Sequence, residues 1–255
     1  MKIAIYDNAE QVAEQAANII CRTINSKANT VLGLATGRTP LKTYQQLIKS
    51  HKQGSVDFSQ VASFNLDEYL GVKPDSHNSY RFFMNENLFR HINIKLENTA
   101  VPCSDSDKVN QTCHQYEQQI KQCGGIDLQL LGLGSNGHIG FNEPSSSFAS
   151  RTRVVALASS TLSDNSDLLT TQEQAIDKAI SMGIATILES KEIVIIALGK
   201  AKAQAVALAI EGALSASCPA SCLQMHGNVT WLLDQEASSL LTQKRYYQLS
   251  QQLLA

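Results

Sequence analysis

The chain has 255 residues, 43% of them hydrophobic, which is enough for one large α/β domain with its own core. Its net charge is −2 and its lysines and arginines are scattered, so it lacks the basic stripe that binding to nucleic acid requires. No segment is apolar enough to span a bilayer, and residues 1–6 leave no room for a signal peptide, which predicts a cytoplasmic protein that does not bind membranes.

Strand-like and helix-like segments alternate along the chain, which is the βαβ rhythm of a parallel sheet. No linker, repeat or low-complexity tract divides the sequence, so we predict a single α/β domain over residues 1–255, with an open, mostly parallel sheet flanked by helices. Serine and threonine are frequent after residue 145, and we predict a mobile lid at about residues 156–180. In chain order, the expected strands are 2–6, 30–35, 61–66, 126–133, 192–198 and 229–233, and the expected helices include 12–24, 40–48, 109–120 and a helix from 200.

A polar turn follows the second expected strand. Residues 33–40 read Gly-Leu-Ala-Thr-Gly-Arg-Thr-Pro, so Gly37 and Thr39 lie between an apolar strand and a helix that begins near Pro40. Free backbone N–H groups at such a helix start attract anions such as phosphate. A strand-to-helix turn that needs only a glycine and a threonine cap would look the same, so this motif alone leaves both interpretations open.

Two adjacent carboxylates close the third expected strand, in Asn65-Leu-Asp-Glu-Tyr69. Successive strand residues point to opposite faces, so only one of Asp67 and Glu68 is expected to face a ligand crevice. Partial desolvation would raise the pKa of that carboxyl and let it shuttle a proton at neutral pH. The alternative is that both residues serve only as turn or capping residues.

The most informative segment is the glycine-rich loop Gly134–Pro144, which follows the apolar run 126–133 and contains His138 and Glu143. A carboxylate beside an imidazole fixes its tautomer and supports its protonated form, which suits acid/base chemistry. The turn Leu198-Gly-Lys-Ala-Lys202 adds two lysines, one of which could neutralise a phosphate. Loops beyond the carboxyl ends of parallel strands meet at one crevice. This expected convergence favours a catalytic histidine over a core histidine, whereas solvated surface positions stay open for the two lysines.

Other chemistries find no support in the sequence. There is no G-x-S-x-G nucleophile elbow and no G-x-G-x-x-G fingerprint leading into a helix, so neither acyl transfer nor a nucleotide is predicted. The six cysteines form no C-x-x-C pair and no cluster with histidine at metal-ligand spacing. We expect reduced thiols and no metal.

Several motifs together resemble the glucosamine-6-phosphate deaminase family, which has a Rossmann-like sugar-phosphate isomerase fold. The resemblance covers nearly the whole chain. A broader superfamily includes 6-phosphogluconolactonases and sugar-phosphate sensor domains, but the sequence His-Ile-Gly-Phe-Asn-Glu-Pro is similar to the deaminase version. The segments that carry the resemblance are Thr36–Pro40, Leu66–Tyr69, Gly134–Pro144, Ser150–Val154, Ser181–Ile187 and Pro219–His226.

The resemblance implies conversion of glucosamine 6-phosphate and water to fructose 6-phosphate and ammonia through an enolamine, without cofactor or metal. Asp67 would move the proton between C2 and C1, and His138 would assist ring opening with Glu143 orienting it. Family members range from monomers to hexamers, so a homo-oligomer is compatible with the resemblance. The residues implied to bind or support the substrate are Thr36, Gly37, Arg38, Thr39, Glu68 and Lys202.

Three positions of the expected site and lid depart from the family pattern. Asn136 stands where some members carry aspartate, and an amide can orient His138 but cannot exchange protons. Arg38 replaces a small residue of the phosphate loop, and Asp167 replaces an arginine that grips the phosphate from the lid. We expect either that Arg38 supplies the missing guanidinium or that the lid closes differently.

These departures keep three rival functions open. The first is deamination of galactosamine 6-phosphate to tagatose 6-phosphate, because a changed lid and phosphate loop could accompany a different C4 preference. A 6-phosphogluconolactonase is less favoured, since it would not keep the sequence Phe141-Asn-Glu-Pro144. A sugar-phosphate sensor without turnover is also less favoured, because the chain has no appended helix-turn-helix or basic segment.

Overall fold

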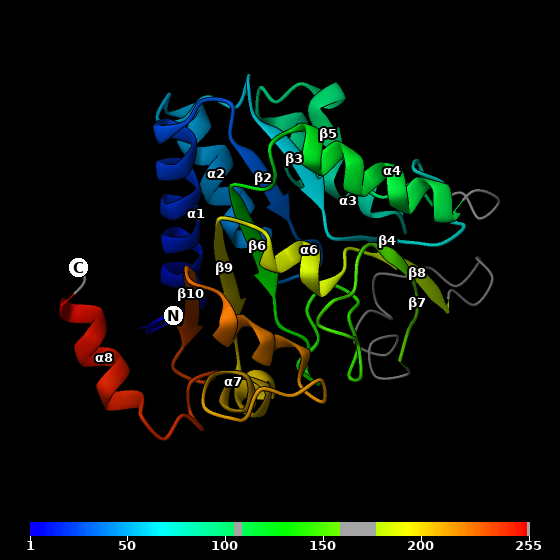
Figure 1. The fold of residues 1–255 in the computed structure, drawn as a ribbon. Coiled ribbons are helices and arrows are strands. Elements are labelled where there is room, and N and C mark those ends of the chain that lie inside the picture. Colours follow the sequence, from blue (N-terminus) through cyan, green and yellow to red (C-terminus); the bar gives the residue numbers. More distant parts are fainter. Residues whose placement is uncertain (105–108, 159–176, 254–255) are drawn as a thin grey trace.

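The computed structural model describes residues 1–104, 109–158 and 177–253. Within these residues the centre is a seven-stranded sheet in the order β1-β10-β9-β6-β2-β3-β5, with every pair of neighbours parallel (Figure 1). The predicted open, mostly parallel α/β sheet is therefore confirmed. Its strands are β1 (Lys2–Tyr6), β2 (Val31–Leu34), β3 (Ala62–Asn65), β5 (Thr99–Ala100), β6 (Leu128–Gly132), β9 (Glu192–Ala197) and β10 (Val229–Asp234).

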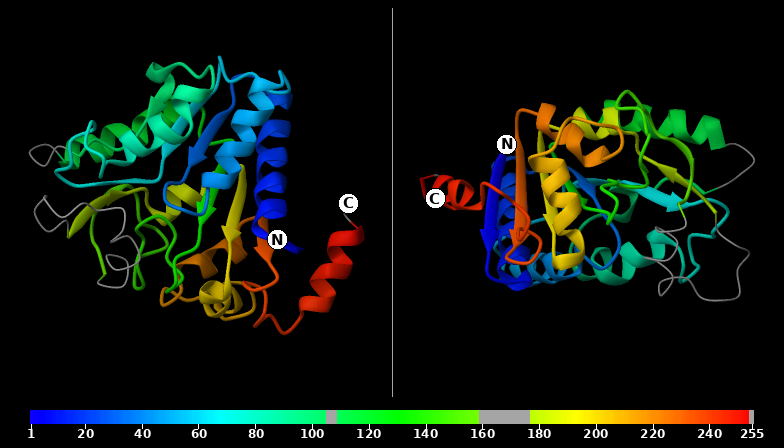
Figure 2. Two further views of the ribbon diagram at one scale, coloured as in Figure 1. Left: turned by 180° about the vertical axis from the view of Figure 1, so that it is seen from behind. Right: turned by 90° about the horizontal axis from the view of Figure 1, so that it is seen from below.

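Helices cover both faces of this sheet (Figure 2). Strand residues alternate between the two faces, as period-two geometry requires: Val194 and Ile196 of β9 pack with α1, α2 and α3, whereas Ile193 and Ile195 pack with α4, α6 and α7. The first helix is long because an apolar stripe repeats at helical spacing and Asn8 caps its N-terminus by accepting a hydrogen bond from Gln11 N. The helices are α1 (Ala9–Ser26), α2 (Leu41–Lys52), α3 (Tyr80–Asn87), α4 (Val109–Gln122), α6 (Ile184–Leu188), α7 (Ala203–Ile210) and α8 (Lys244–Leu253), the last of which lies beside the edge strand β1.

A second, antiparallel sheet was not expected from the sequence. It has the order β4-β8-β7 and consists of β4 (Asp67–Tyr69), β8 (Lys178–Ser181) and β7 (Arg153–Ala156). Leu66 joins the two sheets, because its N–H bonds Leu34 O in β2 while its carbonyl accepts from Met182 N just after β8. The predicted third strand therefore divides at Leu66, and its carboxylates belong to the second sheet.

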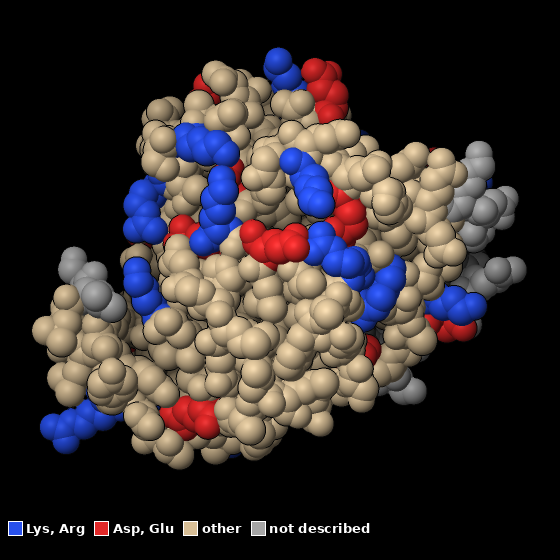
Figure 3. All heavy atoms as spheres, in the orientation of Figure 1, with Lys and Arg blue, Asp and Glu red and all other residues tan. Residues whose placement is uncertain are grey.

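The predicted lid at about 156–180 falls mostly on residues 159–176, which lie outside the described residues, as does Asp167. The neighbouring described elements are β7 and β8. On the face shown in Figure 3, lysine and arginine side chains are interspersed with aspartate and glutamate. No described helix combines the length and the hydropathy that a membrane crossing needs.

Candidate active site

The four polar motifs converge at the carboxyl ends of four adjacent strands, β9, β6, β2 and β3. From β2 the chain continues to β3 on one side, and from β6 it continues to β9 on the other, so the boundary between β2 and β6 is a topological switch point. A cavity of about 340 Å³ opens there. The sequence-predicted residues that line it are Thr36, Gly37, Arg38, Thr39, Asp67, His138 and Lys202.

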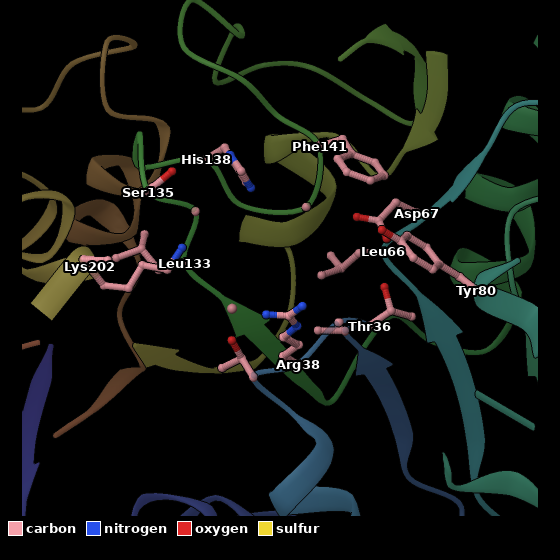
Figure 4. Close-up of a pocket in the computed structure, with 17 residues that line it drawn as sticks. Thr36, Arg38, Leu66, Asp67, Tyr80, Leu133, Ser135, His138, Phe141 and Lys202 are labelled. Atoms are coloured by element: carbon pink, nitrogen blue, oxygen red, sulfur yellow. The ribbon is translucent and has the colours of Figure 1, made fainter. Parts of the chain in front are cut away.

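The turn after β2 forms the floor of the cavity. Gly37 has φ 93°, a conformation that residues with a side chain rarely adopt, and the turn runs directly into α2 at Leu41. Pro40 precedes the helix, and Thr36 and Thr39, which carry hydroxyl groups, line the cavity just before it. Arg38 extends from this turn into the cavity (Figure 4). The turn is therefore suited to bind an anion.

Lys202 adds a second cation to the cavity wall. It ends the short 3₁₀ segment Lys200–Lys202, which follows β9 through Gly199. Gly199 has φ 80°, and its N–H donates to the Asp234 carboxylate at the end of the neighbouring β10. This fixed turn directs Lys202 to the side of the cavity away from Asp67 (Figure 4).

Asp67 faces the cavity, and only 6% of its surface is exposed. Burial, together with the charge of the adjacent Glu68, raises the pKa of Asp67 to about 8. The glycine-rich loop passes close to the carboxyl, since a Cβ on Gly140 would lie 3.5 Å from Asp67 Oδ2. A carboxyl with this pKa is able to exchange a proton near neutral pH.

His138 lies across the cavity from Asp67 (Figure 4). Its Nδ1 is 2.8 Å from Asn136 Oδ1, and Asn136 Nδ2 donates to Glu143 Oε2 at 2.8 Å. An amide oxygen can only accept, so Nδ1 carries the hydrogen and Nε2 carries the lone pair in the neutral ring. Glu143 Oε2 is 3.6 Å from Nδ1, so the carboxylate acts on the ring mainly through Asn136.

Two glycines make this arrangement possible. A Cβ on Gly134 would lie 2.3 Å from His138 Nδ1, so only glycine lets the loop fold back over the ring. Gly137 has φ 85°, and a Cβ there would lie 2.6 Å from the buried Cys218 sulfur. Cys218 is a free cysteine whose buried side chain packs against the loop at Gly137.

Glu68 points away from the cavity, as expected from the alternation of strand residues. It is not among the residues that line this cavity in the described part of the chain. Its carboxylate contacts the start of α3 instead, through Ser79, Tyr80 and Arg81. The contacts of Glu68 thus favour its interpretation as a cap. The Glu68 side chain does not touch the space where a substrate would lie.

Sequence reasoning missed Tyr80 and Phe141 as parts of the cavity wall. Their rings stack at 6.0 Å with an interplanar angle of 19°, and the Tyr80 hydroxyl donates to that of Tyr69 at 3.1 Å. The signal for α3 was weak, because it is only eight residues long; Ser79 as a cap before an aromatic segment was the available sign. Phe141 lies within the glycine-rich motif, but nothing in its spacing indicates a wall residue.

The fold and cavity define an α/β protein in which a strand-to-helix turn, an arginine, a lysine, a buried carboxyl and a histidine line one crevice. This combination fits a small, phosphorylated, proton-exchanging molecule. Among the described residues, no three histidine, cysteine, aspartate or glutamate side chains are grouped as metal ligands would be.

Comparison with known families identifies the class more closely. A family model described as glucosamine-6-phosphate isomerases/6-phosphogluconolactonase matches residues 6–231. The chain therefore belongs to this family, and the resemblance seen in its motifs is confirmed.

Individual relatives cover nearly the whole chain. A glucosamine-6-phosphate deaminase of Colwellia psychrerythraea is 52% identical over 248 residues, which are 97% of this chain and 92% of the relative. One of a Thermoanaerobacter species is 47% identical over 241 residues, covering 94% and 95%. The solved structure of a monomeric glucosamine-6-phosphate deaminase superposes with a TM-score of 0.91 at 44% identity, over 94% of this chain and 100% of that chain. A 6-phosphogluconolactonase from Trypanosoma brucei, at a TM-score of 0.74 and 19% identity over 94% and 98%, shares the fold.

Proposed function

We propose that this chain is a glucosamine-6-phosphate deaminase, which converts glucosamine 6-phosphate and water to fructose 6-phosphate and ammonia. The observation that carries the proposal is the buried Asp67, which titrates near neutral pH and shares one cavity with His138 and an anion-binding turn. The names of relatives at about 50% identity support the same substrate.

The phosphate would bind at the turn between β2 and α2. Thr36, Gly37 and Thr39 offer hydroxyl and backbone N–H donors, and Arg38 and Lys202 offer positive charge. The arginine can bind two phosphate oxygens at once, whereas the lysine acts as a point charge. With the phosphate on this floor, the sugar carbons would extend toward Asp67 and His138.

His138 would begin the reaction by opening the sugar ring. Its Nε2 takes the proton of the C1 hydroxyl, the C1–O5 bond breaks as C1 becomes a carbonyl, and O5 receives the proton. Asn136 and Glu143 hold the tautomer that leaves Nε2 able to accept. A ring that both takes and gives a proton is returned to its starting state at the end of this step.

Asp67 would then move the proton that converts the aldose to a ketose. Its carboxylate removes the proton from C2 while the C1 carbonyl oxygen gains a proton from the 2-ammonium group, which gives an enolamine, and the proton held by Asp67 is then delivered to C1. The double bond then lies between C2 and nitrogen, and water adds to C2 and displaces ammonia. One well-placed acid/base group of this kind contributes roughly 10²–10⁴-fold to the rate.

The raised pKa of Asp67 makes its ionisation depend on the substrate. With a pKa of about 8, the carboxyl holds its proton at pH 7 before substrate binds. The 2-ammonium group of the sugar is bonded to the carbon whose proton is removed, so its positive charge would favour the carboxylate. Binding of the amino sugar would thus produce the base, while a neutral sugar phosphate would leave Asp67 protonated.

The test is to incubate the purified protein with glucosamine 6-phosphate and, separately, with galactosamine 6-phosphate, measuring ammonia and identifying the ketose. Ammonia with fructose 6-phosphate is the expected result, and Asp67→Asn should reduce its rate by roughly 10²–10⁴-fold. Ammonia from the galacto epimer alone, with tagatose 6-phosphate, would contradict the proposal in favour of the epimeric deaminase. No ammonia from either sugar would contradict deamination altogether. A cytoplasmic location and assembly into homo-oligomers stay predictions.

A further inference from the structure

The Glu68 carboxylate accepts four hydrogen bonds next to the cavity, although it does not line it. Its Oε1 accepts from Tyr80 N at 2.9 Å and from Tyr69 N at 3.0 Å. Its Oε2 accepts from Ser79 Oγ at 2.9 Å and from Arg81 N at 3.1 Å. Only 3% of its surface is exposed, so these four donors replace water around the carboxylate.

The four contacts favour the ionised form of Glu68. Three of them are backbone N–H groups, which cannot accept a proton, and Ser79 Oγ already accepts from Arg81 N and Phe82 N. The carboxylate also lies at the N-terminus of α3, where the helix dipole stabilises negative charge. Burial raises the pKa of Glu68, and the hydrogen bonds oppose that shift. Glu68 is therefore the charged member of the adjacent pair, and Asp67 is the member that titrates.

The same contacts connect Glu68 to the cavity wall. Tyr80 is the first residue of α3, and its ring lines the cavity beside Asp67 and stacks on Phe141. Glu68 accepts a hydrogen bond from the backbone N–H of Tyr80, so it fixes the backbone position from which the Tyr80 ring extends. Without the carboxylate, Tyr80 N would lose this buried acceptor, and Arg81 N would lose one of its two acceptors and keep Ser79 Oγ.

We propose that Glu68 is a positioning residue that acts in two ways: it anchors the Tyr80 wall of the cavity, and it places a fixed negative charge directly behind Asp67. This inference rests on the proposed function, because it assigns Glu68 the task of helping burial to keep Asp67 protonated until a cationic sugar binds. A neutral residue at position 68 would remove the second of the two causes that raise the pKa of Asp67, so Asp67 would be less basic in the empty enzyme.

The other charged and titratable groups around the pair do not supply this charge. Arg81 is positive, and its guanidinium donates to Thr99. Arg38, Lys202 and His138 face Asp67 from the rest of the cavity and are cationic or neutral. The buried phenols near the pair have pKa values above their usual range, chiefly because of burial, and stay neutral: Tyr44, Tyr69, Tyr80 and Tyr116.

The experiment compares Glu68→Gln, Glu68→Asp and Ser79→Ala with the natural chain in the pH dependence of kcat/KM. Glu68→Gln removes the charge at nearly constant shape, so the acid limb should move at least about one pH unit lower. Glu68→Asp keeps the charge but is too short to reach the start of α3. Its acid limb should stay within about 0.3 pH units while KM rises at least about threefold. Ser79→Ala removes one donor and the α3 cap, so it should lower Tm without lowering the acid limb.

The amino group of the substrate titrates identically for every variant, so only differences between variants are interpreted. An unchanged acid limb in Glu68→Gln, or a limb lowered by one pH unit in Glu68→Asp, would overturn the proposal and leave Glu68 as a cap alone. If Glu68→Gln does not fold, the Glu68→Asp comparison still decides between these outcomes.

A second readout needs no turnover. The stability of the natural chain should fall from about pH 4, the ordinary pKa of Asp67, to about pH 8, its pKa in the folded chain, and in Glu68→Gln this fall should end about one pH unit lower. If the natural chain released no ammonia, the proposed function would fail, whereas this pH dependence would still show whether Glu68 controls Asp67. An identical pH dependence in both chains would overturn the role of Glu68 by itself.

Discussion

Replacing Asp67 by asparagine should stabilise the fold while abolishing most of the activity. The pKa of this carboxyl is raised from its ordinary value of 3.8 to about 8, chiefly by burial and then by Glu68. A raised pKa in the folded state means that stability is complete below the unfolded pKa and is lost as pH rises toward the folded pKa. The native state therefore becomes progressively less stable between about pH 4 and about pH 8.

The magnitude follows from the difference between the two pKa values. At pH 7 Asp67 is ionised in the unfolded chain but protonated in the folded chain. This pH lies about three units above the pKa of the unfolded chain, and each unit corresponds to about 1.4 kcal/mol. The folded state loses about 4 kcal/mol in this way, which is a large part of the stability of an ordinary domain. Asparagine has nearly the same shape and no charge, so Asp67→Asn should recover that amount.

Urea unfolding of both chains at several pH values measures the effect. The stability gain of Asp67→Asn should rise from about 2 kcal/mol at pH 5 to about 4 kcal/mol at pH 7. Asp127→Asn is a matched control of opposite sign: burial opposes ionisation there, but bonds from Lys191 and Lys27 outweigh it and lower the pKa of Asp127. That variant should lose stability at pH 7. A gain for Asp67→Asn that does not change with pH, or no gain at any pH, would refute the reasoning.

Three further predictions concern the turn, the loop and the backbone. Arg38→Ala should raise KM for the phosphorylated sugar at least about tenfold with little change in kcat. The control is Arg22→Ala, which replaces an exposed arginine of α1 and should change neither constant. An unchanged KM in Arg38→Ala would show that Arg38 does not bind the phosphate. Asn136→Asp would place a negative charge against Nδ1, so an NMR titration of the His138 ring should move to higher pH, and a shift to lower pH would contradict the bond geometry. Gly183→Ala would bring a Cβ to 2.1 Å from a backbone carbonyl oxygen, so urea unfolding should show a loss of stability of at least about 2 kcal/mol. An unchanged stability would contradict this steric clash.

Six strands of the described central sheet could be predicted because each is a short apolar run bounded by turn residues, whereas β5 (Thr99–Ala100) has only two residues and was not predicted. The convergence of the motifs followed from the same pattern, since parallel strands place their carboxyl ends at one edge. The antiparallel sheet could not be predicted, because β4, β7 and β8 are each only three or four residues long, and β4 continues from β3 after one residue. Such strands exist through their pairing with distant segments and carry no periodicity of their own.

Individual roles in the site were harder to assign than its location. Alternation along the strand indicated that Asp67 and Glu68 face opposite ways, but not which one faces the cavity. That choice depends on α3, whose first residues lie 11 to 13 positions after Glu68 and supply its donors. Similarly, the sequence placed His138 near Glu143, but only the folded loop places Asn136 between them. Contacts between short, irregular segments determine these roles, and sequence spacing does not encode them.

The specificity of the loop motif has a physical explanation in the packing of its last residues. Ile139 is fully buried in the core, Gly140 lets the loop pass Asp67, and Phe141 stacks on the cavity wall. Asn142 is fully buried and donates to the carbonyls of two residues that flank it in space, while its own oxygen accepts from an arginine of β7. Glu143 reaches back to hold the amide that orients the histidine. A substitution at any of these positions would move the ring or the acid, so the motif predicts chemistry because its non-reacting residues set the geometry of the reacting ones.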